Sequence, residues 1–428
     1  MRTLLALTAA LVWSFAANAD SIAIINGTVH TVADGSVLNN ATVVIEDDKI
    51  VAVGVDVYVP IGAIVIDAGG RPVTPGLMNV VTKMGLLEVG QVSGADDYTS
   101  VGAPFSAGFD VSAGLNPDSV LIPVTRVDGV TRAVTVPSAF GSVFSGLGAI
   151  VHLGTGTGLG DDMVVKARAA QYAGFGGRAA DAMGGTRGGL AVFMRQAFDD
   201  ALHYDANRRN FDQNRTRDYV LHQLDLDALV PVLEGDIPLV VTVNRASDMR
   251  VLVGLAEEYN IRMVFSSARE AWKVADDLAA AEIGVIIDPS NNLPTSFDNV
   301  YATLDNAKRL YDAGVKIAIA TTSFNDYNNP RNVTQIAGIG VANGLPFDAA
   351  LAAITRNPAE LFGVDDEYGT LEVGKDADVV VWEGDPLEVT VLPTDVIIKG
   401  KVMPLDSRQI RLRDRYRDLS DPEPMQFR

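Results

Sequence analysis

The chain has 428 residues, of which 48% are hydrophobic and 21% are charged, a composition typical of a folded globular protein. Its formal net charge of -20 argues against nucleic acid or an anionic membrane surface as a partner, because both would repel it. The sequence contains no cysteine, which excludes disulfides, thiolate nucleophiles and cysteine-ligated zinc. This length accommodates one large domain together with a smaller one.

Residues 1–19 have the three parts of a secretory signal. Arg2 provides the basic start, Leu4 to Phe15 form an apolar run, and Ala17 to Ala19 form a small-residue cleavage site. The apolar run is too short to serve as a stable bilayer anchor. We therefore expect a periplasmic or secreted protein that is cleaved after Ala19 and has no membrane span.

Both ends of the remaining chain are rich in short strand patterns. β-branched runs separated by turn signals occupy Ile22–Asn26, Ala41–Ile45 and Ile50–Val53. Similar runs return far along the chain, at Gly369–Trp382 and Asp395–Lys399. We expect the two ends to pair as halves of one small β-sandwich, with the intervening chain inserted between them.

The stretch at residues 72–85 opens the longer part of the chain and carries a recognisable pattern. Pro75 to Met78, followed by Asn79, Val81 and Lys83, resembles the Pro-Gly-hydrophobic-hydrophobic-Asp-x-His-x-His stretch of the amidohydrolase superfamily, in its imidazolonepropionase-like branch. The resemblance implies an α/β fold in which a metal-dependent (β/α)8 TIM-like barrel is inserted in the small β-sandwich. Two later segments, Asn357–Glu360 and Gly369–Asp378, are also similar to segments of that family.

The expected domain organisation follows from this resemblance and from the strand-rich ends. It consists of the signal peptide (1–19), the first half of the β-sandwich (20–70), the amidohydrolase-like barrel (71–365), the second half of the β-sandwich (366–403) and a charged C-terminal tail (404–428).

A glycine-rich region lies at residues 141–160 and includes the repeat Gly154-Thr-Gly-Thr-Gly-Leu-Gly160. Its spacing does not fit the G-x-G-x-x-G pattern, and no P-loop lysine follows, so it does not predict a phosphate cradle. We expect a flexible loop over the mouth of the barrel.

The second half of the inserted part alternates regularly between strand and helix patterns. Strands are predicted at Leu239–Val243, Ile261–Phe265, Gly284–Ile287 and Val315–Ala320, with helical periodicity between them. An earlier strand is predicted at Asp128–Val136. Repeated units of this size predict a parallel sheet, and the resemblance implies that it closes into a barrel.

The residues at the expected metal-ligand positions differ from those of the family. The resemblance implies that one or two divalent ions activate water while an aspartate on the eighth strand moves the proton. Neutral imidazoles or carboxylates are needed for this chemistry, and they are replaced here by the following side chains: Val81 and Lys83 on the first strand, Thr242 and Asn244 on the fifth, Ser267 on the sixth and Thr322 on the eighth. Asn79 occupies the acidic position of the first strand.

The histidines and nearby acidic residues offer few replacements. His152 lies near a stretch where relatives often have lysine, and it is the histidine that we expect near the mouth. We interpret His30, His203 and His222 as packing or surface residues. Asp96, Asp97 and Asp110 follow the first strand and could supply carboxylates, although acidic loop residues are more often simply solvated.

Strand alternation predicts that Val81 and Lys83 face the same way, into the barrel mouth. A buried ammonium is costly unless it is paired. We expect Lys83 to occupy the place of the metal, to reach a carboxylate such as Asp110, or to bind an anionic ligand group. If the first strand is shifted, Lys83 instead extends to solvent.

These substitutions favour a non-catalytic amidohydrolase-like protein, acting as a partner subunit or as a binding protein for a small amide-like ligand. We expect no metal cofactor, although the family implies zinc or another divalent metal. The chain would form either a homo-oligomer or a hetero-complex with an active amidohydrolase-like chain. Two alternatives remain: an active amidohydrolase that hydrolyses C–N bonds with a rearranged site or with Lys83 as base or carbamate, and a structural subunit whose barrel face is covered by another chain.

Export gives the first testable prediction. Protein recovered from the native host should begin at Asp20, because the apolar run and the small residues before it form a cleavable signal. Intact-mass analysis checks this directly. A mass that retains residues 1–19 would contradict it.

Overall fold

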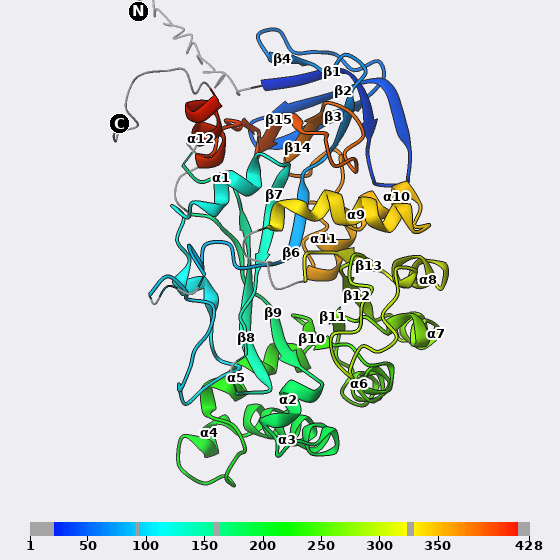
Figure 1. Cartoon of the computed structure of the whole chain (residues 1–428). Coiled ribbons are helices and arrows are strands. Elements are labelled where there is room, and N and C mark those ends of the chain that lie inside the picture. Colours follow the sequence, from blue (N-terminus) through cyan, green and yellow to red (C-terminus); the bar gives the residue numbers. More distant parts are fainter. Residues whose placement is uncertain are drawn as a thin grey trace, which may run out of the picture.

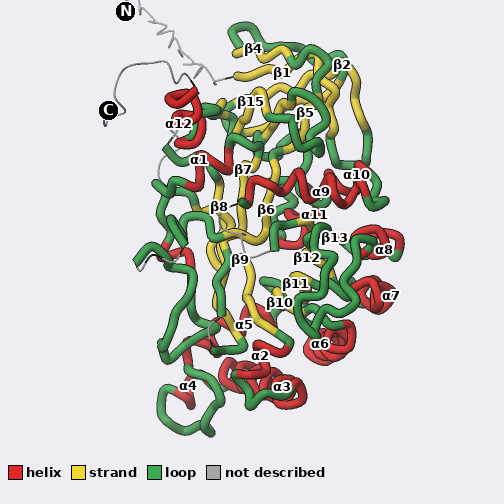
Figure 2. Tube along the Cα trace, in the orientation of Figure 1, coloured by secondary structure: helices red, strands yellow, loops and turns green. Residues whose placement is uncertain are grey.

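The computed structural model describes residues 21–90, 92, 94–139, 141–156, 162–322 and 329–417, so the expected signal peptide lies outside the described residues. Two eight-stranded sheets organise this part of the chain. Figure 1 shows the first sheet at one end of the molecule and the second continuing from it, and Figure 2 shows helices ranged along the outside of the second.

The first sheet combines strands from both ends of the chain. Its order is β16-β15-β14-β5-β1-β2-β3, and β4 pairs with β1. The strands are β1 (Ser21–His30), β2 (Val37–Glu46), β3 (Lys49–Gly54), β4 (Ile64–Asp67), β5 (Pro72–Pro75), β14 (Val379–Trp382), β15 (Pro393–Ile398) and β16 (Lys401–Val402). The N-terminal and C-terminal segments therefore meet where β5 pairs with β14 in antiparallel register.

Alternating side chains explain why this sheet folds into a sandwich. Val43 and Ile45 of β2 share one apolar core with Val379 and Val381 of β14, although the two strands are not neighbours in the sheet. The other face of β14, with Val380 and Trp382, packs against the rest of the molecule. Strand β14 is therefore buried on both faces, which accounts for its uninterrupted apolar sequence.

The second sheet has the order β13-β12-β11-β10-β9-β8-β7-β6. Its strands are β6 (Leu77–Thr82), β7 (Val130–Thr135), β8 (Phe144–His152), β9 (Val164–Gly174), β10 (Leu239–Val243), β11 (Met263–Ser267), β12 (Gly284–Ile287) and β13 (Ile317–Ile319). One core cluster contains a residue from every strand: Met78, Val134, Ile150, Tyr172, Val240, Val264, Ile286 and Ala318. This cluster fills the interior of a barrel, and the expected fold class is confirmed.

The barrel is nearly closed between its first and last strands. Strands β13 and β6 are bridged by backbone, since Ile319 N donates to Ala353 O and Met78 N donates to Ile354 O, both at 2.8 to 2.9 Å. Asn79 Nδ2 adds a side-chain contact of 3.4 Å to Thr321 Oγ1. The linker around Ala353 and Ile354 thus acts as a spacer that satisfies edge groups on both strands.

The helices pack on the outer faces of the strands. Leu190, Phe198, Leu252 and Leu278 share a core with Leu239 and Phe265. The α-helices are α1 (Leu121–Arg126), α2 (Gly177–Asp181), α3 (Arg187–Ala206), α4 (Arg208–Phe211), α5 (Gln223–Leu233), α6 (Ala246–Tyr259), α7 (Ala275–Ala280), α8 (Asn306–Asp312), α9 (Val333–Ala342), α10 (Phe347–Ala352), α11 (Arg356–Phe362) and α12 (Arg408–Arg417). Short 3-10 helices are η1 (Val111–Gly114), η2 (Ala271–Val274) and η3 (Pro330–Asn332). Within the described residues, no helix is both long enough and apolar enough to cross a membrane.

The glycine-rich region differs from its expected loop structure. Residues 144–152 form strand β8, which runs antiparallel to both neighbours, β7 and β9. The connections before and after β8, residues 136–143 and 153–163, are too short for the dozen or more residues that a parallel crossover requires. The prediction of a flexible loop over the mouth is wrong for this strand, and residues 157–161 lie outside the described residues.

Two glycines of this region serve close packing inside the strand. A Cβ on Gly148 would lie 2.6 Å from the Tyr172 ring and 2.9 Å from Thr135 O. Gly146 has φ +123, and a Cβ there would lie 2.4 Å from Phe109 O. Gly146 and Gly148 therefore belong to a strand that neighbouring groups approach closely.

The passage from sandwich to barrel falls at Gly76, later than the expected boundary at residue 71. Strand β5 belongs to the first sheet and β6 to the second, with Gly76 between them. A Cβ on Gly76 would lie 2.2 Å from Thr131 Oγ1, so only glycine allows this close approach to β7.

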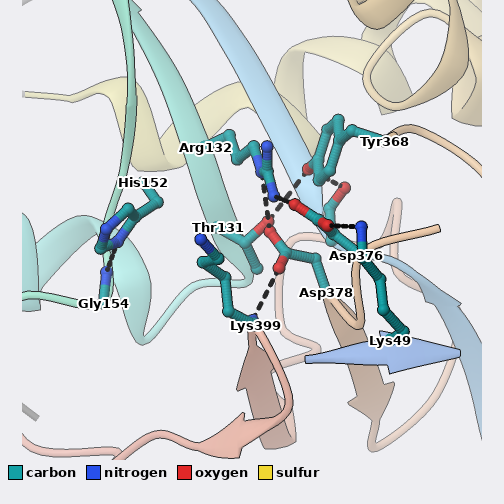
Figure 3. A network of polar contacts seen from close by, with 10 residues as sticks. Lys49, Thr131, Arg132, His152, Gly154, Tyr368, Asp376, Asp378 and Lys399 are labelled. Carbon is teal, nitrogen blue, oxygen red and sulfur yellow. Dashed lines mark hydrogen bonds and ion pairs between the residues drawn. The ribbon is translucent and has the colours of Figure 1, made fainter. Parts of the chain in front are cut away.

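A buried ionic network joins the two sheets (Figure 3). Arg132 of β7 is 0% exposed; its Nη2 pairs with Asp376, and its Nε lies 3.2 Å from Asp378 Oδ2. Lys49 of β3 adds a 2.6 Å ion pair to Asp376 Oδ1. The Arg132 guanidinium also lies 4.5 Å from the centroid of the Tyr368 ring. Three segments distant in sequence thus meet around one cation.

The charges in this network hold one another in the ionised form. Burial works against ionisation of Arg132, yet the charge of Asp378 raises its pKa and keeps it protonated. Burial also works against ionisation of Asp376, but the hydrogen bond from Lys49 and the charge of Arg132 lower its pKa and keep it deprotonated. The two aspartates come from the Gly-Lys-Asp-Ala-Asp segment ending at Asp378, which gives that segment a structural role.

Replacement of Arg132 tests the importance of this junction. Arg132→Met should lower the free energy of unfolding by about 3–5 kcal/mol, because it leaves Asp376 and Asp378 buried without their cation. Urea denaturation measures the change. Arg168→Met is the matched control: its pair with Asp110 is 66% exposed at the arginine side chain, and its loss should cost at most about 1 kcal/mol. Equal effects of the two substitutions would contradict the interpretation.

Candidate functional site

The carboxyl ends of the parallel strands form the candidate site, because most of the expected ligand positions lie there. Strands β6 and β7 run parallel, as do β9 to β13. Val81, near the end of β6, packs against the interior cluster of the barrel.

Lys83 lies at the end of β6 and is buried, with 5% exposure. Its Nζ donates to Val136 O and to Ser138 Oγ, each at 2.7 Å. The amine also lies 4.8 Å from the centroid of the Tyr98 ring. Lys83 thus binds the segment that follows β7, and it does not extend to solvent.

Asp110, the carboxylate suggested for Lys83 from the sequence, has other partners. Its Oδ2 lies 2.8 Å from Arg168 Nε, and its Oδ1 accepts from Ser112 N and Ser112 Oγ. Burial opposes ionisation of Asp110, but the bonds from Ser112 and Arg168 outweigh it and lower its pKa. Asp96 and Asp97 are exposed loop residues.

Asn79, in the acidic position of the family pattern, ties β6 to the end of the barrel sheet. Its Nδ2 donates to Pro330 O at 2.8 Å, and its Oδ1 accepts from Val81 N at 3.1 Å. An aspartate could not donate to the carbonyl of Pro330 in its ionised form. The amide therefore suits this closed arrangement, in which the side chain is fully buried.

The ends of β10 and β11 present hydroxyl groups. Thr242 of β10 is exposed, and its register partner on β11 is Ser266. Val240 and Val264, two residues earlier on each strand, lie in the interior cluster. Because side chains alternate along a strand, Thr242 and Ser266 share this inward face. Ser267, the residue expected at the histidine position, pairs instead with Val243, whose side chain joins the outer core.

Asn244 supports the loop that follows β11. Its Oδ1 lies 3.4 Å from Arg269 N, and its backbone oxygen accepts from Glu270 N at 3.0 Å. Asn244 therefore orders the neighbouring backbone through both its side chain and its main chain.

The end of β12 contributes Asp288, a residue that the sequence reasoning missed. Asp288 is 5% exposed, and its Oδ1 accepts from Ser290 N at 3.0 Å and from Ser290 Oγ at 2.5 Å. Its Oδ2 accepts from Thr322 N at 3.3 Å, which joins β12 to the expected eighth-strand position. An acidic residue directly after a four-residue apolar strand was the available signal.

Arg269 is a second missed residue at this end. Its Nη1 donates to Thr295 Oγ1 at 3.0 Å, whereas its Nε is buried without a hydrogen-bond partner among the described residues. Burial lowers the pKa of Arg269, and the charge of Asp288 partly opposes this shift. This end of the barrel therefore carries a guanidinium whose Nε has no hydrogen-bond partner among the described residues.

The segment 289–305 is anchored beside these strand ends. Asp298 accepts from Gly177 N at 2.9 Å and pairs with Arg187 at the start of α3. Glu270 Oε1 accepts from Tyr301 N at 3.1 Å, and Glu270 Oε2 accepts from Ala246 N at 3.2 Å. These bonds fix the segment to the loops that follow β9, β10 and β11.

His152 lies at the other end of the barrel, and its expected place near the mouth is wrong. Because β8 runs antiparallel, its last residue pairs with Arg132, near the start of β7 (Figure 3). His152 Nδ1 accepts from Gly154 N at 3.1 Å, and Nε2 lies 2.8 Å from Asp162 O, so the neutral ring donates from Nε2. Burial lowers the pKa of His152, which favours this neutral form.

The other histidines lie on separate elements. His30 ends β1, His203 lies in α3, and His222 precedes α5, where its Nδ1 accepts from Leu224 N at 3.2 Å. Within the described ranges, no group of three or more histidine, aspartate or glutamate residues is arranged to hold a metal ion.

The fold thus combines a nearly closed α/β barrel with a β-sandwich that is built from both chain ends. Residues 246–403 match the model of the amidohydrolase family. Among solved structures, an amidohydrolase from Thermotoga maritima is similar with a TM-score of 0.79 and 25% identity, covering 90% of this chain and 99% of that one.

Curated proteins give the same relationship at the level of sequence. Amidohydrolase tasK from Hapsidospora irregularis is 26% identical over 372 residues, which is 80% of this chain but only 37% of that protein. Imidazolonepropionase from Maricaulis maris is 38% identical over 84 residues, or 18% of this chain and 20% of that enzyme. These matches support the assignment of the chain to the amidohydrolase superfamily, in its imidazolonepropionase-like branch.

Substitution of Lys83 tests its structural role at the site. Lys83→Met should lower the free energy of unfolding by about 1–3 kcal/mol, because Val136 O and Ser138 Oγ lose their buried donor. Chemical denaturation provides the measurement. Lys308→Met serves as the control, since the Lys308 side chain is 44% exposed and its pair with Asp312 should contribute only about 0.3–0.5 kcal/mol. A Lys83 effect no larger than that of the control would count against the assignment.

Proposed function

We propose that this chain is an exported, non-catalytic amidohydrolase-superfamily protein that binds a small amide-like ligand or serves as a partner subunit. One observation carries this proposal. The six expected ligand positions hold valine, lysine, threonine, asparagine, serine and threonine: Val81, Lys83, Thr242, Asn244, Ser267 and Thr322.

The chemistry of these side chains does not fit a catalytic divalent metal. Such a metal needs imidazole or carboxylate ligands and one open position for water. Valine cannot coordinate, and the Lys83 amine is already turned toward Val136 O and Ser138 Oγ. Neutral hydroxyl and amide groups are poor zinc ligands. No metal-dependent step is therefore derived for this chain.

The groups at the strand ends are suited to binding. Thr242 presents an exposed hydroxyl on the inward face, and Arg269 is a half-buried guanidinium side chain shortly after β11. Donors and hydroxyls of this kind can orient the carbonyl and carboxylate oxygens of an amide-like molecule. Such contacts would position a ligand without activating water for attack.

The alternative is an active amidohydrolase with a rearranged site. It would have to use groups such as Asp288 or Lys83 for proton transfer. Asp288 accepts three hydrogen bonds, from Ser290 N, Ser290 Oγ and Thr322 N, which hold its carboxylate in a structural position. These contacts favour the binding role over the catalytic one.

Metal content is the decisive measurement. The purified protein should contain far less than one zinc, manganese or iron per chain after dialysis, because the donor set lacks imidazole and carboxylate at the six positions. Elemental analysis gives the stoichiometry. A parallel screen for hydrolysis of N-acyl amino acids and dipeptides should show no turnover, while thermal-shift measurements on the same panel report binding.

A restored-ligand variant provides the matched control. Val81→His, Lys83→His and Thr322→Asp together place two imidazoles and one carboxylate at family positions, and this variant should bind more zinc than the parent chain. Close to one metal per parent chain, together with hydrolysis that a chelator abolishes, would overturn the proposal and establish the active-enzyme alternative.

A further inference from the structure

Helix α12 is strongly basic although the chain as a whole is acidic. Asp414 is its only acidic residue. Five of its ten residues are arginine: Arg408, Arg411, Arg413, Arg415 and Arg417. No residue of this helix is buried. Because the whole chain carries a formal charge of -20, this concentration of positive charge marks a distinct surface.

Only part of this charge is neutralised locally. Arg411 Nε lies 3.5 Å from Asp406 Oδ2, and Arg413 Nη2 lies 2.8 Å from Asp414 Oδ1. Arg408, Arg415 and Arg417 have no ion pair with any described residue, although Arg415 lies 5.8 Å from the centroid of the Tyr416 ring. Within the described residues, these three guanidinium groups are not neutralised by a carboxylate.

The same helix exposes an apolar pair. Leu412 is 39% exposed and Tyr416 is 43% exposed. They are separated by four positions, so they lie on one face of the helix. An exposed leucine and tyrosine flanked by arginines are typical of a surface that binds a partner, because they combine apolar contact with charge.

A cavity with complementary features lies elsewhere on the chain. It has a volume of about 270 Å³ and lies between the turn after β1, helix α8 and helices α10 and α11. Its apolar lining includes Val32, Val37 and Leu351, and Tyr311, a residue that is 44% exposed, also lines it. The cavity can therefore receive an apolar side chain.

The charge around this cavity is negative. Asp34 and Asp348 line it, and Asp385 lies close enough to act electrostatically on His30, another lining residue. Burial lowers the pKa of His30, so the imidazole adds no charge at neutral pH. Arg356 also lines the cavity, but its Nη1 donates to Val32 O and Ala33 O, and its Nε pairs with Glu360.

The two surfaces cannot meet within one chain. Figure 1 shows α12 on one side of the molecule, whereas α10 and the hairpin of β1 and β2 lie on the opposite side. We propose that α12 of one copy docks on this cavity of a second copy, with Leu412 and Tyr416 against the apolar lining and the arginines of the helix against Asp34, Asp348 and Asp385.

An anionic membrane is a less suitable partner for α12. Membrane-surface helices bury a broad apolar face, whereas α12 offers only Leu412 and Tyr416 as exposed apolar residues. A body with a net charge of -20 would also be repelled from anionic lipid. A second copy presents carboxylates together with an apolar cavity, and thus matches both features of the helix.

Charge reversal tests this proposal on the purified full chain. The first variant combines Arg408→Glu, Arg415→Glu and Arg417→Glu, and the second combines Asp34→Lys, Asp348→Lys and Asp385→Lys. Light scattering coupled to gel filtration should show that the parent chain associates, and that each variant alone associates at least about tenfold more weakly because like charges then face each other. An equimolar mixture of the two variants should regain association, since each reversed surface then meets its opposite.

A variant with the same change in net charge serves as the control. Arg178, Arg209 and Arg215 are exposed and have no ion pair with a described residue, so their replacement by glutamate should leave association unchanged. The proposal is overturned if the parent chain is a monomer, if either reversed variant associates like the parent, or if the mixture fails to regain association. Restoration in the mixture also shows that both variants are folded.

Discussion

The buried pairing of Arg132 with Asp376 and Asp378 is the contact on which the arrangement of the two sheets depends. A guanidinium with 0% exposure would be prohibitively costly without carboxylates beside it. Those carboxylates come from the C-terminal segment. The Arg132 guanidinium of β7 is therefore paired only when the last part of the chain has joined the sandwich. Lys49 of β3 brings the N-terminal segment to the same place through its pair with Asp376. A buried charge thus specifies which distant segments must meet.

His152 lies beside this network, and its burial there accounts for its neutral state. The reversed strand β8 ends beside Arg132, which places a histidine close to a permanent cation. Burial is the main cause that lowers the pKa of His152; the Asp162 carbonyl and the charge of Asp378 oppose the shift, and the charges of Lys399 and Arg132 add to it. The ring is therefore neutral and serves as a structural hydrogen-bonding group. A histidine that looked available for metal chemistry belongs to the junction between the sheets.

At the opposite end of the barrel, hydrogen bonds to backbone and to hydroxyl groups hold the strand ends in place. Lys83 binds the segment after β7, Asn79 binds Pro330 O, and Asp288 binds the backbone around Ser290 and Thr322. Each of these contacts links neighbouring loops. The family barrel is thus retained with its strand ends joined by local polar contacts, which is compatible with a binding or partner role.

The sequence predicted the fold family of this protein through its resemblance to the amidohydrolases, and its local patterns predicted the strand-rich ends. Apolar runs alternating with helical patterns predicted strands such as Leu239–Val243 and Gly284–Ile287 with the bounds that β10 and β12 have. Local patterns sufficed there because one strand's burial is recorded in its own side chains. The direction of β8 was decided by connection length, and the glycines that disguised this strand are explained only by Tyr172 and Phe109 packing against it. The places of His152, Ser266 and Asp288 depended in the same way on register and on strand direction. These are properties of pairs of segments, so only the tertiary structure could determine them.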